Sequence, residues 1–231
     1  MSNLTDLILP KSDAAKDRFR LGFNSVAPIQ EVVLTRRGLF GHVLIRGEDY
    51  GGRTKAVSEL CGDAALAGFG VIYVTDGMGA ALASPLREKA HRAFGAGKYY
   101  ALHIDAESGC KFKVSRHGVS VLQFNSTAAP SSADRIRARM PSIIEWIVNS
   151  NADAPLLLAL EKYHLDFSDF VLDMLDQAYT VNCAMLLTTL GSDPRGDTPP
   201  IHPKVYEKCG IVVDLNRRWP QAASQPKSLP Q

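Results

Sequence analysis

One stretch of this 231-residue chain restricts its possible folds more than any other. Residues 47–54, GEDYGGRT, have the spacing of a phosphate-binding loop, G-x-x-x-x-G-K-[ST], with Arg53 where that pattern has lysine. An apolar run over 42–45 precedes the glycines, and a helical pattern over 55–61 follows them. The stretch therefore predicts a turn between strand and helix whose backbone N–H groups can surround an anion.

The side chains of this turn decide which ligand it can hold. We predict that the nucleotide-binding residues include Gly47, Gly51, Gly52, Arg53 and Thr54. The hydroxyl of Thr54 is also the candidate ligand for Mg²⁺. Arginine is a broad planar fork rather than a compact point charge, so Arg53 should attract phosphate but fit the lysine's position poorly. The alternative interpretation is a surface glycine turn that binds nothing.

The overall composition is typical of one globular α/β domain. Hydrophobic residues make up 45% and charged residues 22%, and the formal net charge of +2 is too small to indicate nucleic-acid binding by bulk electrostatics. The chain shows no secretory signal pattern and no apolar run near the ~20 residues that span a bilayer. We therefore expect a cytoplasmic location without direct membrane insertion, and any membrane association through partners. The scattered cysteines predict free buried thiols rather than a metal site: Cys61, Cys110, Cys183 and Cys209.

Short apolar strands alternate with helices along the chain, which predicts a mostly parallel central sheet with helices on both faces. We expect an N-terminal arm over 1–30 with a short helix over 14–20, a single α/β domain over 31–219, and a disordered tail over 220–231. Pro141 should kink or split its helix. The expected strands are 31–34, 42–46, 71–74, 99–104, 155–160, 184–188 and 211–215. The expected helices are 54–67, 84–94, 131–149 and 167–178.

The strand expected at 155–160 ends beside an acidic residue. In enzymes with a phosphate-binding loop, one carboxylate near the loop holds Mg²⁺ and another group orients the attacking nucleophile. Glu161 stands at the second position, which makes it the candidate catalytic residue, whereas Leu160 replaces the metal-binding aspartate. The alternative is an exposed carboxylate at a strand end with no chemical role.

Taken in order, these features resemble a known family over about residues 29–215. The chain is similar to the RecA-like motor domain of conjugative coupling proteins, the TraD/TraG-type ATPases of type IV secretion in the FtsK/HerA superfamily. The resemblance implies a RecA-like P-loop NTPase fold, ATP and Mg²⁺ as cofactors, and a place for Asp76 among the nucleotide-binding residues. It rests on the segments 47–54, 68–76 and 121–125, the strand that ends at Glu161, and the strand at 184–189.

The departures from the family's pattern fall on chemical positions. The chain has Arg53 for lysine, Leu160 for aspartate, Thr188-Thr-Leu190 where a glutamine senses the γ-phosphate, and Met78 where many members have lysine. Single charged groups contribute ~10³ or more to the rate of phosphoryl transfer. The resemblance with degenerate Walker motifs therefore favours a pseudo-ATPase over an active hydrolase. Such a subunit would act by binding or assembly with protein partners of a conjugative DNA-transfer or type IV secretion apparatus, in a homo- or hetero-oligomer, and an inert site would need no cofactor.

Two other functions of the same apparatus stay open. A slow but active ATPase would use Arg53 for phosphate, Thr54 for Mg²⁺ and Glu161 for water. A DNA-binding accessory would use arginines near Pro141 or at 217–218, although a solvated helix face explains the first group as well. That first group consists of Arg135, Arg137 and Arg139.

Overall fold

The computed structural model describes residues 18–23, 31–47, 52–75, 80–104, 113–124, 132–161, 168–189 and 202–215. The strands are β1 Arg18–Phe23, β2 Glu31–Thr35, β3 Val43–Arg46, β4 Gly70–Thr75, β5 Tyr99–Ile104, β6 Val119–Phe124, β7 Leu156–Leu160, β8 Cys183–Thr189 and β9 Ile211–Asp214. The helices are α1 Arg36–Phe40, α2 Arg53–Leu66, α3 Ala80–Phe94, α4 Ser132–Asn149, α5 Ser168–Gln177 and α6 Pro203–Lys208.

Within this described part of the chain, the strands form two sheets. The main sheet has seven strands in the order β5-β6-β4-β7-β8-β3-β9, and every neighbouring pair is parallel. Strands β1 and β2 form a separate antiparallel pair. The parallel sheet requires a crossover between successive strands, and helices supply most of these crossovers, as expected for alternating strands and helices.

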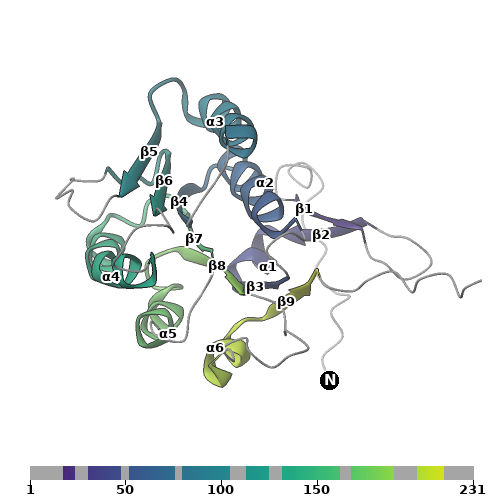
Figure 1. The fold of residues 1–231 in the computed structure, drawn as a ribbon, viewed down its shortest axis with the longest axis vertical. Helices are drawn as coiled ribbons and strands as arrows, with labels where there is room; N and C mark the ends of the chain where they lie inside the picture. The colour runs from purple at the N-terminus through teal and green to yellow at the C-terminus, as the bar shows by residue number, and fades with distance from the viewer. Residues whose placement is uncertain are drawn as a thin grey trace, which may run out of the picture.

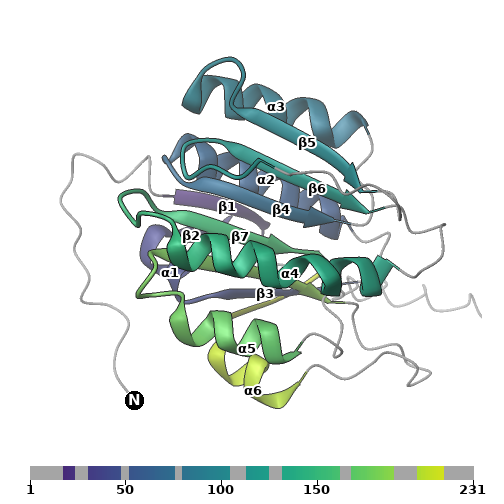
Figure 2. The same ribbon diagram turned by 90° about the vertical axis from the view of Figure 1, so that its left-hand side faces the viewer.

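Helices cover both faces of the main sheet. Figure 1 shows α2 and α3 on one side and α4, α5 and α6 on the other, and Figure 2 shows the same layers after a quarter turn. Two separate hydrophobic cores correspond to these faces, one lined by α1, α2 and α3 and the other by α4, α5 and α6. The predicted fold class, a mostly parallel sheet covered by helices on both faces, is therefore confirmed.

Strand β7 shows how the sequence builds both cores at once. Leu156, Leu158 and Leu160 lie in the core beneath α4 and α5, whereas Leu157 and Ala159 lie in the core beneath α2. Successive side chains of a strand point to opposite faces, and a strand buried on both faces reads as a continuous apolar run. The same alternation places the next residue, Glu161, on the face of the sheet that α2 covers.

The structure corrects the prediction for the N-terminal region. The helix expected over 14–20 is wrong at its described end, because Arg18–Phe23 is strand β1 and pairs with β2. Phe19 is buried and packs edge-on against Phe69, with 6.0 Å between ring centroids. Pairing with β2 and burial of this ring outweigh the local helical pattern, since strand formation depends on such tertiary contacts. Residues 1–17 and the tail over 220–231 lie outside the described ranges.

Three helices also differ from expectation. Of the two alternatives expected at Pro141, a kink or a split, the split does not occur, because α4 is a single helix that continues through this residue. Two short helices were not predicted. Helix α1 begins after Thr35, whose hydroxyl accepts from the N–H of Gly38 at 3.1 Å, and α6 begins with Pro203 behind the capping side chain of His202. Both carry ordinary N-terminal helix signals, but they are too short to show a hydrophobic period.

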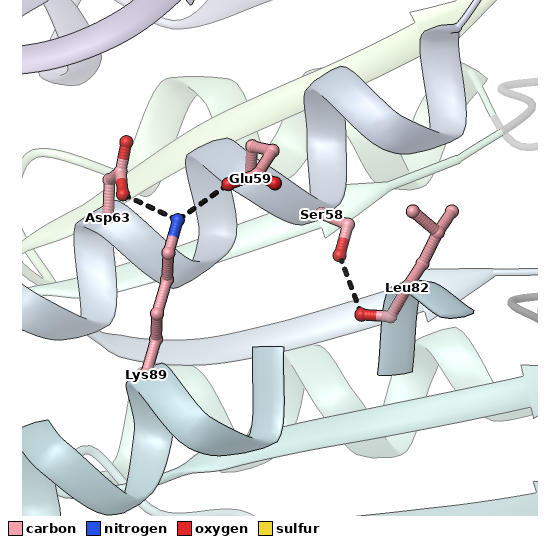
Figure 3. Close-up of polar contacts among 5 residues, drawn as sticks. All are labelled: Ser58, Glu59, Asp63, Leu82 and Lys89. Atoms are coloured by element: carbon pink, nitrogen blue, oxygen red, sulfur yellow. Dashed lines mark hydrogen bonds and ion pairs between the residues drawn. The ribbon is translucent and has the colours of Figure 1, made fainter. Parts of the chain in front are cut away.

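Helix α2 is joined to α3 along its length. The Lys89 ammonium donates to Glu59 Oε2 at 2.6 Å and to Asp63 Oδ1 at 2.8 Å, and the Ser58 hydroxyl donates to the carbonyl of Leu82 at 3.4 Å (Figure 3). The lysine stem passes over Gly62, where a β-carbon would lie 2.4 Å from Lys89 Cδ. These contacts hold the helix that follows the glycine turn against its neighbour.

Two expectations from composition can be compared with the described residues. Cys61, Cys183 and Cys209 are buried free thiols, as predicted, while Cys110 lies outside the described ranges. Burial raises the pKa of the Cys183 thiol to about 12 and that of Cys209 to about 11, so both stay protonated. Among the described helices, none combines the length and the apolar character needed to cross a bilayer.

Candidate nucleotide-binding site

The sheet order brings two separate parts of the sequence to one edge. The chain leaves β3, passes through α2 and enters β4, which lies beyond β8 and β7 in the sheet. Helix α2 therefore crosses β8 and β7, and it contacts β7. All strands of this sheet are parallel, so the carboxyl ends of β3 and β7 lie at the same edge. The first turn of α2 consequently meets the end of β7.

The start of α2 carries the features of an anion site. Gly52 is the N-cap residue with φ +83°, a left-handed conformation that favours glycine. No side chain caps this helix start with a hydrogen bond, and the first turn, which begins with Arg53 and Thr54, contains no acidic residue. The N-terminus of a helix is electropositive, and here no acidic side chain of the helix itself compensates it. This end of α2 therefore favours a bound anion.

Arg53 adds a buried positive charge to the same place. Its side chain is fully buried, and Nη1 donates to the carbonyl oxygen of Gly47 at 2.8 Å. The N–H of Gly47 in turn donates to the carbonyl of Thr189 at 3.2 Å, which ties the beginning of the glycine turn to β8. A guanidinium at the positive end of a helix gains free energy when an anion binds beside it. The guanidinium of Arg53 is therefore bonded to Gly47, the first residue of the glycine turn.

Glu161 is the acidic group of this edge, and it touches the first turn of α2. Its side chain is only 2% exposed, and Oε1 accepts a hydrogen bond from the Thr54 hydroxyl. Oε2 accepts from the Tyr73 hydroxyl at 2.7 Å and from the Thr75 hydroxyl at 2.6 Å, both of which belong to β4. Three hydroxyls from two elements therefore hold one buried carboxylate.

Strand alternation explains why Glu161, and not Leu160, reaches Thr54. Leu160 is the last residue of β7 and packs in the core beneath α4 and α5. Glu161 follows it and points to the face that α2 covers, as its bond to Thr54 shows. Leu160 and Glu161 therefore lie on opposite faces of the sheet, because a one-residue step along a strand moves a side chain to the other face.

The buried hydroxyl and thiol next to this carboxylate keep their protons. Burial raises the pKa of Tyr73 well above its ordinary value, and the negative charge of Glu161 raises it further. Burial followed by the charge of Glu161 likewise raises the pKa of the Cys61 thiol. A protonated phenol is a hydrogen-bond donor, in agreement with the bond from the Tyr73 hydroxyl to Glu161 Oε2.

The donor chemistry of this edge fits Mg²⁺ with a phosphate ligand. Mg²⁺ prefers oxygen ligands, and in nucleotide sites it is usually bound through one or two carboxylates together with substrate phosphates. Thr54 and Glu161 offer a hydroxyl and a carboxylate at the anion-attracting end of α2. Within the described ranges, no group of three or more histidine, cysteine, aspartate or glutamate side chains forms a metal site of its own.

The predicted site residues can now be placed. Gly52, Arg53, Thr54 and Glu161 come together at one edge of the sheet, along with the backbone of Gly47. Gly51 and Asp76 lie outside the described ranges, as do Met78 and Leu190. Two polar residues that complete the network, Tyr73 and Thr75, are not among the site residues predicted from the sequence. They could have been recognised as two hydroxyl-bearing residues in an otherwise apolar, buried strand, because buried hydroxyls require hydrogen-bond partners.

Comparisons with known proteins agree with this architecture. No protein-family model and no curated protein matches the sequence. Among solved structures, the cytoplasmic domain of EssC aligns with a TM-score of 0.50 at 13% identity, covering 86% of this chain and 36% of that one. ATPases 2 and 3 of EssC from Geobacillus thermodenitrificans align with a TM-score of 0.50 at 11% identity, covering 87% and 38%. The bacterial conjugative coupling protein TrwBdeltaN70 in its unbound form aligns with a TM-score of 0.48 at 10% identity, covering 77% and 68%.

This chain therefore spans less than two-fifths of the EssC chains it resembles. At these identities the likeness defines the fold alone. The parallel sheet, the helices on both faces and the alignment with EssC identify that fold as the RecA-like P-loop ATPase type. The fold that the sequence predicted is confirmed.

Proposed function

We propose that this chain is a RecA-like, ATPase-type domain that binds Mg²⁺–ATP and hydrolyses it slowly or not at all. The observation that carries the proposal is the bond between Thr54, on the first turn of α2, and the buried carboxylate of Glu161 at the end of β7. This bond places an oxygen-ligand pair beside the electropositive start of a helix. Gly47, Gly52 and Arg53 would contact the phosphates from the turn, and Gly51 and Asp76 are proposed for the same site from the sequence.

The position of Glu161 favours retention of nucleotide over turnover. Its Oε1 is bonded to Thr54 and its Oε2 to two hydroxyls of β4. In this arrangement the carboxylate of Glu161 would bind Mg²⁺. A different group would then have to orient the attacking water. Arg53 replaces the compact charge that a lysine places on the β- and γ-phosphates. The loss of the lysine charge and the loss of a group that orients water would each lower the rate by ~10³. Together they would leave a slow enzyme or an inactive one.

The cellular role we propose is that of a binding or assembly subunit in a conjugative DNA-transfer or type IV secretion apparatus. The resemblance of the sequence to coupling-protein motor domains supports this role, and the fold is compatible with it. Its partners would be protein subunits of that apparatus, in a homo- or hetero-oligomer that includes an active ATPase. Any association with a membrane would pass through those partners.

Calorimetric titration of ATP tests the nucleotide site. The wild type should bind ATP more tightly with excess Mg²⁺ than with EDTA, and Thr54→Ala should remove about tenfold or more of this Mg²⁺-dependent gain. Thr180→Ala is the matched control, because Thr180 is exposed and donates to the carbonyl of Gln177 after α5. Absence of binding heat in the wild type under both conditions would contradict the proposal.

Phosphate release separates the pseudo-ATPase from a slow enzyme. Hydrolysis by the wild type should not exceed that of Glu161→Gln, a variant that keeps the side-chain shape but loses the charge. A wild-type rate clearly above this variant would establish the slow ATPase and remove the inactive alternative.

A further inference from the structure

The two β4 hydroxyls that hold Glu161 have no place in the function described so far. Tyr73 and Thr75 lie on the same face of β4, and both donate to the same carboxylate oxygen, Oε2, at 2.7 and 2.6 Å. Strand β4 pairs directly with β7, where Val74 lies opposite Leu160. The pair therefore reaches the carboxylate from the strand next to the one that delivers it.

We infer that Tyr73 and Thr75 are positioning residues that set the orientation of the Glu161 carboxylate for Mg²⁺. The inference rests on the proposed function, because it assigns these hydroxyls a role in the same nucleotide site. Neither residue contacts the ligand in this assignment. They act through Glu161, whose other oxygen, Oε1, faces Thr54.

The geometry explains how this positioning works. Two donors on Oε2 fix the rotation of the carboxylate about its last bond, so Oε1 points toward the first turn of α2. Both bonds are in the short range of hydrogen bonds to charged acceptors, which are stronger than neutral ones. Tyr73 has no exposed surface and Thr75 has none, so water does not replace either donor. The orientation of the carboxylate is therefore built into the sheet before any ligand arrives.

A purely structural role makes a different prediction. A buried carboxylate needs hydrogen-bond donors whether or not it binds a metal, so loss of a donor would lower the stability of the fold in either case. Only the positioning role links these hydroxyls to the metal. Groups that orient a metal-binding carboxylate typically change metal affinity 10–100-fold when they are removed.

The test is the ratio of the ATP dissociation constant in EDTA to that in excess Mg²⁺, measured by calorimetry on the full chain. Tyr73→Phe and Thr75→Val should each reduce this ratio about tenfold while leaving the dissociation constant in EDTA unchanged. Thr75→Ser keeps the hydroxyl and should keep the wild-type ratio. Tyr179→Phe, at an exposed tyrosine, is the control for loss of a phenol hydroxyl. Thermal unfolding of each variant shows that the protein measured is folded.

The outcomes distinguish this inference from the proposed function. If the wild type binds ATP with a Mg²⁺-dependent gain and both Tyr73→Phe and Thr75→Val keep it, the inference is wrong and the nucleotide site stands. If the two variants lower affinity equally in EDTA and in Mg²⁺, their role is structural and the inference is again wrong. If the wild type gains nothing from Mg²⁺, both the inference and the proposed metal site fail together. Should Thr75→Val not fold, Tyr73→Phe decides the question.

Discussion

Two buried arginines lie at opposite edges of the main sheet, and their surroundings differ in electrostatic sign. Arg53 is fully buried at the edge where the parallel strands end, and Arg116 is 4% exposed at the edge where they begin. Arg53 is the first residue of α2, at the positive end of that helix. Arg116 lies at the negative end of α4, close to the end of α5. The same side chain therefore experiences opposite helix dipoles.

Arg116 joins the segments that enter the sheet. Its guanidinium donates to the carbonyls of Ala154 and Val181, each at 2.8 Å, to that of Ile147 at 3.3 Å, and to the Ser150 hydroxyl at 2.8 Å. Burial lowers its pKa, and carbonyl dipoles rather than a carboxylate surround its charge in these contacts. At this edge, carbonyl groups of the backbone therefore accept most of the hydrogen bonds of the buried guanidinium.

The contrast shows why one edge of the fold is the candidate ligand site and the other supplies stability. The negative ends of helices stabilise a buried cation without any ligand, so Arg116 is satisfied in the isolated protein. The start of α2 is electropositive and Arg53 adds a second positive group there, so this edge would stabilise a bound phosphate as well as the nearby carboxylate of Glu161.

The largest effect is expected on stability at the Arg116 edge. Arg116→Lys should lower the free energy of unfolding by about 3 kcal/mol or more, because a single ammonium cannot reach carbonyls from separate segments and buried acceptors lose their partners. Arg53→Lys, the matched change at the other edge, should cost less than about 1 kcal/mol, since a lysine is the residue that the loop pattern expects. Urea unfolding of both variants measures the difference, and equal losses would contradict the comparison.

The next effect concerns pH and the same stabilising edge. His42 precedes β3, is 3% exposed, and its Nδ1 accepts from the N–H of Met185 at 3.2 Å. Burial lowers the pKa of His42 from 6.5 to about 4, so the unfolded chain binds a proton that the folded protein excludes. Stability should therefore be complete above pH 6.5 and decrease as the pH falls toward 4, by roughly 1–2 kcal/mol between pH 7 and 5.

Substitution of this histidine tests the cause. His42 has φ +59°, and asparagine tolerates that left-handed conformation, so His42→Asn should flatten the dependence of unfolding free energy on pH in this range. His91→Asn, at an exposed histidine of α3, is the control for the substitution itself. An unchanged pH dependence in His42→Asn would show that the acid sensitivity comes from other groups.

Most of the fold could be predicted from the sequence, because the main strands are continuous apolar runs between breaks. The run over Leu156–Leu160 is buried on both faces, and its continuous apolar composition is sufficient to predict a buried strand. Strand β1 could not be recognised in this way, since its identity depends on pairing with β2 and on the packing of Phe19. Local pattern is sufficient where burial is complete and fails where a distant partner decides.

The candidate site divides along the same line. The spacing of the glycine turn and the acidic residue after an apolar strand identified Arg53, Thr54 and Glu161 as candidates, and the structure brings them together. Linear order could not show that β4 lies next to β7, which is what carries Tyr73 and Thr75 to the carboxylate. Linear order also could not show what Leu160 and Glu161 touch, because the two side chains lie on opposite faces of the sheet.

The smallest expected effect concerns nucleotide affinity at the Arg53 edge. Arg53→Lys should bind Mg²⁺–ATP about fivefold more tightly than the wild type, roughly 1 kcal/mol, because a lysine presents a compact charge to the β- and γ-phosphates. Calorimetry in excess Mg²⁺ measures this gain, and Arg87→Lys on the exposed surface of α3 is the matched control. Weaker binding by Arg53→Lys would mean that the guanidinium makes ligand contacts that a lysine cannot replace. In that case the arginine would be a working part of the anion site, and the contrast between the two edges would become stronger.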